Sequence, residues 1–159
     1  MSRVLFSSLV LGGLVMTAIP SLMAATGQPL PIPDRARAAA RIVVATVAET
    51  NARYETNEFG DELIVTYAHL HVEETVKGPA DPAIVALEGG TIDGITMRVS
   101  SLPALTKGER AVFFLTPGAK GAFRPHLRGQ GILKLDAHDR VPGSSLTLDE
   151  IRRLAGSGK

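Results

Sequence analysis

The residues best suited to chemistry lie in one long segment, residues 63–76. Side chains two positions apart leave the same face of a β-strand. Imidazoles can donate, accept or change charge near neutral pH, and an aromatic ring is typical of recognition surfaces. We therefore expect a binding surface on the row that has this spacing: Tyr67, His69, His71 and Glu73.

The same row permits a second interpretation, a metal site. Two imidazoles on one strand face can reach the same ion, and Glu73 could add a carboxylate. His126 or His138 could supply a third nitrogen from elsewhere in the chain. A periplasmic metal-binding protein or metalloenzyme built on His69 and His71 is thus the alternative to a binding surface, although the solvent face of a half-buried strand also requires polar residues.

Catalytic motifs are not recognisable in this sequence. The serine pairs at 100–101 and 144–145 lack the glycine-flanked elbow of hydrolases. Gly89 and Gly90 are followed by a strand-like segment rather than a helix, so they predict a turn or bulge and not a dinucleotide fingerprint. We assign no catalytic residue and expect no cofactor, and an enzyme is the less favoured class.

The elements that must position the row are mostly strands, which predicts an all-β fold, a small OB-like barrel or sandwich. Residues 42–47 are apolar on both faces, as in a covered strand. Residues 63–76 alternate, which places one row in the core: Ile64, Ala68, Leu70, Val72 and Val76. Glycine and proline separate the shorter predicted strands: 83–87, 95–99, 111–115 and 132–135.

Two helices and one connection complete the prediction. Thr147 and Glu150 form a capping box before a carboxy-terminal helix. A short helical turn is expected over 34–41, capped by Asp34. The polar residues 51–62 predict an exposed hairpin connection.

The amino-terminal segment predicts export. Residues 1–25 contain a basic start at Arg3, an apolar run and a small-residue exit at Ala24 and Ala25, which are the parts of a cleavable signal peptide. Residues 26–40 then form a Pro- and Ala-rich tether with the helical turn, and residues 41–156 form a single β-rich domain. We expect a periplasmic or secreted protein that keeps no membrane span after processing.

Charge and cysteine content restrict the partners. The chain has 17 basic and 16 acidic residues and no cysteine. Because the two signs are interspersed, a nucleic-acid partner is disfavoured. Thiol chemistry, iron–sulfur ligation and disulfides are excluded.

Short motifs occur in order at 43–47, 72–78 and 108–115. They resemble the secreted OB-fold domains of the netrin-module and tissue-inhibitor-of-metalloproteinase type. Gly89 with Gly90 and the segment 129–131 are similar to those of a group of uncharacterised secreted bacterial domains. These families imply an OB-fold barrel. Their inhibitor role uses an amino-terminal cysteine that chelates the protease zinc, so that role cannot apply to this chain, and no functional residue is carried over.

These observations favour an exported, non-catalytic binding or accessory domain. Its expected partner is an exported protein or another component of the cell envelope. The sequence does not define its oligomeric state.

Overall fold

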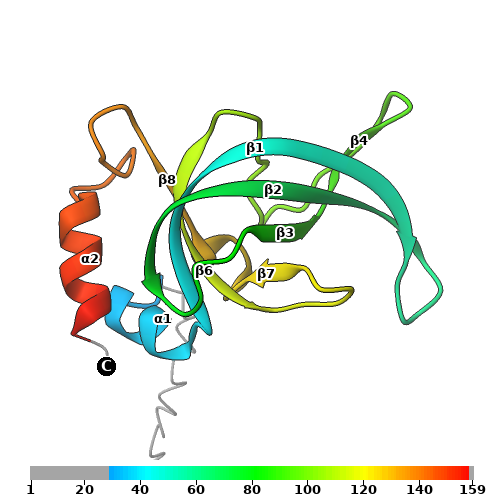
Figure 1. The fold of residues 1–159 in the computed structure, drawn as a ribbon. Coiled ribbons are helices and arrows are strands. Elements are labelled where there is room, and N and C mark those ends of the chain that lie inside the picture. Colours follow the sequence, from blue (N-terminus) through cyan, green and yellow to red (C-terminus); the bar gives the residue numbers. More distant parts are fainter. Residues whose placement is uncertain (1–28, 158–159) are drawn as a thin grey trace, which may run out of the picture.

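The computed structural model describes residues 29–157, so the predicted signal peptide lies outside the described residues. Strands dominate this part of the chain, and a helix lies near each end (Figure 1). The elements follow one another in this order: α1 (Ile32–Ala38), β1 (Arg41–Thr56), β2 (Glu62–Lys77), β3 (Ala83–Glu88), β4 (Gly90–Ile92), β5 (Ile95–Met97), β6 (Arg110–Pro117), β7 (Phe123–Pro125), the 3₁₀ turn η1 (Arg128–Gly131), β8 (Ile132–Leu135) and α2 (Leu148–Gly156).

Five strands form a closed ring. The sheet runs β1-β2-β3-β7-β6, and β6 pairs back onto β1. All neighbours are antiparallel except β3 and β7, which are parallel at Val85 and Phe123. β8 pairs with β6 outside the ring, and β4 and β5 form a separate hairpin. The prediction of a mostly β, barrel-like fold with a carboxy-terminal helix is therefore confirmed.

β6 is the central strand, as its composition predicts, because it pairs with β1, β7 and β8. Phe113 and Phe114 project to opposite sides of it and are both fully buried. Phe113 belongs to the apolar cluster that contains Val43, Leu70 and Val85. Phe114 belongs to a second cluster formed with the two helices. Both faces of this strand are thus covered, which explains its continuous apolar run.

The helices cover one side of the ring (Figure 1). The predicted capping box of α2 is present, since the Thr147 side chain accepts a hydrogen bond from the Glu150 backbone N–H at 3.3 Å. The prediction for α1 was wrong in its bounds and in its cap. The helix spans Ile32–Ala38 rather than 34–41, Pro31 is its N-cap, and Asp34 lies in the first turn, paired with Arg37. Ile32 and other apolar residues of α1 pack against α2, so this part of the expected tether contributes to the core.

The largest departure from prediction is the long arm formed by β1 and β2 (Figure 1). Residues 51–62 are not all connection, because β1 continues to Thr56 and pairs with β2 as far as Glu62. The connection itself is short, and the Asn57 side chain orders it by accepting the backbone N–H groups of Phe59 and Asp61. A bulge between Val47 and Glu49 marks the point where the arm leaves the ring.

Candidate functional site

The predicted row lies on the outer face of β2. His69, His71 and Glu73 are exposed, whereas Tyr67 is half-buried. On the opposite face, Ile64, Ala68 and Leu70 are buried. The facing of this strand is therefore as predicted from Ile64 to Val72. It is not for Val76, which packs against the second cluster because bulges interrupt the alternation after Val72.

Tyr67 is held by its own chain. Its hydroxyl donates to Glu55 Oε1 at 2.6 Å, and the Arg53 guanidinium stacks on its ring. Lys120 Nζ lies 3.1 Å from the other oxygen of Glu55. The hydrogen bond from Tyr67, with smaller contributions from Lys120 and Arg53, holds the pKa of Glu55 below its ordinary value. Tyr67 thus belongs to a surface network that braces the arm.

Glu73 is also engaged. It accepts hydrogen bonds from Thr46 Oγ1 and from Arg110 Nε, each at 2.6 Å, and Arg110 also pairs with Asp139. Burial acts to raise the pKa of Glu73, but the hydrogen bonds from Thr46 and Arg110 outweigh it, so this pKa lies below its ordinary value. His69 and His71 are consequently the most available members of the row.

The part of the chain that the structure describes contains no assembled set of metal ligands. Within residues 29–157, no group of three or more His, Asp or Glu side chains lies close enough together to hold an ion. His69 and His71 share a strand face, but His126 and His138 do not join them in such a group.

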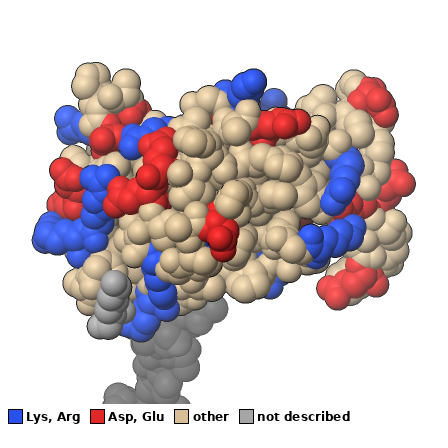
Figure 2. Space-filling view, viewed as in Figure 1, with Lys and Arg blue, Asp and Glu red and all other residues tan. Residues whose placement is uncertain are grey.

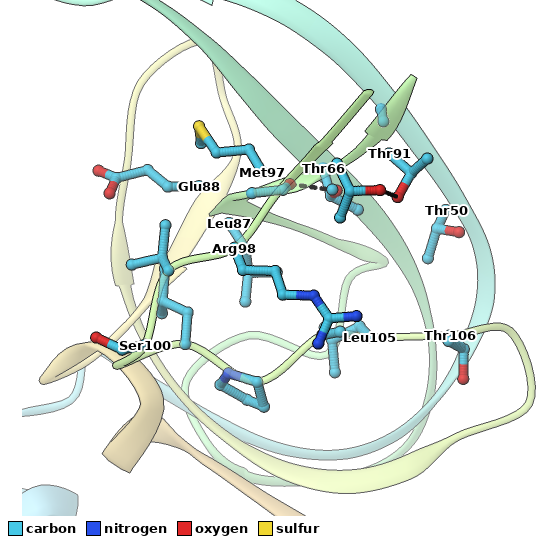
Figure 3. A pocket seen from close by; sticks show the side chains of 18 residues that line it. Thr50, Thr66, Leu87, Glu88, Thr91, Met97, Arg98, Ser100, Leu105 and Thr106 are labelled. Atoms are coloured by element: carbon cyan, nitrogen blue, oxygen red, sulfur yellow. Dashed lines mark hydrogen bonds between the residues drawn. The ribbon is translucent and has the colours of Figure 1, made fainter. Parts of the chain in front are cut away.

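A different feature stands out, a cleft of about 610 Å³ beside the base of the arm. Its walls are the arm, the β4–β5 hairpin and the loop that follows β5 (Figure 3). Five threonines contribute hydroxyl groups: Thr50, Thr66, Thr91, Thr96 and Thr106. The apolar lining is Ala52, Leu87, Met97, Val99, Leu102, Pro103, Ala104 and Leu105.

Arg98 is the basic residue of this cleft. Its side chain extends across the hollow toward the side on which Leu105 and Thr106 lie (Figure 3). No hydrogen bond or ion pair within residues 29–157 holds its guanidinium. The carboxylate that lines the same cleft, Glu88, instead pairs with Arg128 at 3.0 Å. The cleft therefore presents a cation without a partner, among walls that are otherwise mostly neutral.

Local geometry fixes the wall that carries Arg98. Gly90 has φ +142°, and a Cβ there would lie 2.3 Å from Thr66 Oγ1. The Thr66 hydroxyl donates to the Gly89 carbonyl at 2.6 Å, which joins β2 to the start of β4. The Thr91 and Thr96 hydroxyls, 2.9 Å apart, then bridge β4 and β5. At Gly89 and Gly90 the backbone therefore passes so close to Thr66 of β2 that the position of the β4–β5 hairpin relative to the arm is fixed.

Sequence reasoning missed this cleft. The segment 95–99 was predicted as one strand, but β5 ends at Met97, so Arg98 falls in a loop. The available signal was a single arginine between the apolar residues Met97 and Val99. A charged residue in so short an apolar run indicates a turn out of the core, although its direction depends on the fold.

The charged residues visible in Figure 2 gather toward the two ends of the molecule, and a largely uncharged region lies between them.

Neither helix in residues 29–157 has the length and apolar character needed to cross a bilayer. Comparison of the chain with protein-family models and with curated proteins finds no match.

Proposed function

We propose that this protein is an exported, non-catalytic binding domain that recognises a carboxylate-bearing group of a protein or another envelope component. The observation that carries the proposal is the unpaired Arg98 guanidinium in the cleft beside the arm. A guanidinium binds a carboxylate through two parallel hydrogen bonds, and such charged bonds are stronger than neutral ones.

The rest of the cleft supports this ligand class. Its volume of about 610 Å³ falls within the usual range of ligand sites, roughly 300–1,000 Å³. The threonine hydroxyls can donate or accept, which suits the polar groups next to a carboxylate. Arg98 is exposed at the mouth of the cleft, so a ligand that covers the apolar lining would itself displace water from the guanidinium and strengthen the charge interaction.

The architecture supports an OB-like barrel as part of the same proposal. A five-stranded ring closed by β1 and β6, with one parallel pair between β3 and β7, fits the partly open five-stranded barrel of that class. OB-like barrels commonly bind ligands on a strand face and its neighbouring loops. The arm and the loop after β5 have that relationship in this protein.

The binding experiment compares matched arginine variants. Arg98→Gln removes the cation of the cleft, whereas Arg124→Gln removes an exposed arginine on β7 that lies outside the cleft. Each purified variant is used to capture partners from an envelope extract, and its melting temperature is recorded. We expect Arg98→Gln to reduce capture about tenfold or more, because a charged hydrogen-bonded pair contributes ~1.5–3 kcal/mol, and Arg124→Gln to behave as the parent protein.

The same experiment tests the outer row as the rival surface. A double variant, His69→Ala with His71→Ala, is included beside the two arginine variants. If this double variant lost capture while Arg98→Gln kept it, the binding site would lie on the outer face of β2.

Export is tested by the amino terminus of the protein after secretion. Mass spectrometry should find a chain that begins at Ala25 or Thr26, since the small residues there suit signal cleavage. A membrane-bound species that keeps Met1 would contradict this part of the proposal.

A further inference from the structure

The outer edge of β1 changes character along its length. Arg41–Thr46 pair with β6, and Val47 continues the contact, its N–H donating to the Glu109 carbonyl and its carbonyl accepting from Gly108, both at 2.8 Å. Beyond Val47, Ala48 is the bulge residue, and residues 49–56 pair with β2 alone. Within residues 29–157, no backbone hydrogen bond reaches the other edge of this stretch, which is roughly 30 Å long.

An open strand edge presents a row of backbone donors and acceptors. Proteins usually protect such an edge by making it short, by placing proline in it or by covering it. The edge at residues 48–56 contains no proline and has no backbone partner in the described structure. A bulge marks its start, and its charged residues, Glu49, Arg53 and Glu55, alternate with Thr50 and Ala52 and so lie on the opposite strand face. An extended polypeptide that adds one strand to the sheet can satisfy these groups all along the edge.

The open edge and the cleft are parts of one surface. Thr50 and Ala52 belong to this edge and also line the cleft. Tyr54 lies on the same strand face and is 38 % exposed, and Ile95 at the tip of the β4–β5 hairpin is 58 % exposed. Because strand side chains alternate, every second side chain of an added strand would face the cleft, where Arg98 lies.

We infer that the ligand of the cleft is an extended polypeptide segment that adds as a strand along residues 48–56 of β1 and places an acidic side chain against Arg98. The inference rests on the proposed function and names its ligand class. The edge supplies affinity through main-chain hydrogen bonds, and Arg98 supplies selectivity.

The probe is a displayed library of random peptides of about nine residues, the length that the open edge accommodates. Peptides are selected on the purified protein and counter-selected on Arg98→Gln. We expect enriched sequences that alternate in polarity and carry Asp or Glu at one fixed position. Amide exchange with a selected peptide bound should slow in residues 48–56.

Two chemical controls separate strand addition from other binding. In a double-mutant cycle, replacing the peptide carboxylate by an amide should cost about tenfold in Kd with the parent protein and little with Arg98→Gln. Two N-methylated peptides are compared, one modified at the odd-numbered amides and the other at the even-numbered amides. One of them should lose binding and the other should keep it, because only alternate amides face the edge.

Each remaining result overturns the inference. Strand addition at this edge would be excluded if both N-methylated peptides lost binding equally. It would also be excluded if a bound peptide slowed amide exchange only on the outer face of β2. Arg98-dependent binding of small dicarboxylates, with no selected peptide that protects residues 48–56, would leave the proposed function standing and remove the polypeptide ligand. Self-association that slows exchange at this edge in the absence of peptide would assign the edge to a second copy of the chain.

Discussion

The guanidinium carbon of Arg53 lies 3.9 Å from the ring centroid of Tyr67. The two residues come from neighbouring strands of the arm, and Glu55 joins them by hydrogen bonds to both side chains. An arginine over an aromatic ring contributes only modestly to stability when the pair is exposed to solvent. The aromatic ring that the sequence suggested for partner recognition is therefore also a brace for the arm.

Tyr67→Phe should weaken this brace without removing the ring. We expect a loss of ~0.5–1.5 kcal/mol in the free energy of unfolding, the usual net value of one hydrogen bond. The pKa of Glu55 is lowered in the folded protein, so its contribution is present above the ordinary glutamate pKa and is lost as pH falls through the lowered one. Urea unfolding of both proteins at neutral pH and below the glutamate range should show the difference shrinking in acid. If the difference in unfolding free energy between the two proteins grew on acidification, the stabilising role of the Tyr67–Glu55 hydrogen bond would be contradicted.

The two faces of β2 should respond differently to truncation. Leu70 is buried in the core of the ring, so Leu70→Ala should cost ~2–5 kcal/mol. His69 is its exposed neighbour, and His69→Ala should change stability by less than ~0.5 kcal/mol. The melting temperatures of the two variants, compared with that of the parent protein, show which face of β2 is buried. Comparable losses in both would show that the outer row is structural.

The fold was predictable where apolar patterns are long. Residues 42–47, 63–76 and 111–115 were recognised because burial on one or both faces leaves a clear alternation or a continuous run. The sequence of the outer half of β1 predicts a connection because this part of the sheet is only partly covered, so polar and small residues such as Asn51, Ala52 and Glu55 are tolerated there. β4 and β7 were missed as strands because three residues are too few for a period to be visible.

The candidate site was less predictable than the fold, for a physical reason. Thr50 lies far from Arg98 and Thr106 in the sequence, and only the fold brings the three residues around one cleft. The outer row was visible because its spacing is local. Local spacing identifies which residues share a face, but it does not show which face is hollow.

The double glycine should be intolerant of any side chain at its second position. Gly90→Ala would place a Cβ 2.3 Å from Thr66 Oγ1 and break the alignment of the β4–β5 hairpin. Gly94 is the matched control, because it also has positive φ but its Cβ would meet nothing within 4 Å. Gly94→Ala should cost only the backbone strain of ~1–2 kcal/mol, and Gly90→Ala a further ~1–3 kcal/mol from overpacking. Equal losses in urea unfolding would show that the contact with Thr66 is relieved at no cost.

Removal of metal ions should leave the stability of the protein unchanged. Two apolar clusters, one on each face of the central strand, supply the core, and neither depends on a metal ligand. The melting temperature should therefore be the same with and without a chelator. A large fall that zinc reverses, and that is absent in a variant with His69→Ala and His71→Ala, would establish the metal interpretation instead.

Lys77 should prove more important than its position at a strand end suggests. Its ammonium group donates hydrogen bonds to the carbonyls of Ala36, Arg37 and Ala39, at 2.8, 3.2 and 2.6 Å. These carbonyls lie at and just after the carboxy-terminal end of α1, where the helix leaves its last acceptors without partners and where a positive charge is favourable. This one side chain therefore fastens α1 to the end of β2.

Lys77→Met keeps much of the aliphatic stem and removes the charge, so it isolates this interaction. We expect a loss of ~1.5–3 kcal/mol, the value of hydrogen bonds to a charged group, and faster amide exchange in α1 before the rest of the domain. Lys107→Met, in an exposed loop, is the control and should leave both measurements unchanged. If Lys77→Met lowered stability uniformly, with no earlier exchange in α1, then Lys77 would support the barrel as a whole. If neither measurement moved, α1 would be held by its apolar contacts in the second cluster and by Arg35, which donates to the Gln130 carbonyl at 2.7 Å.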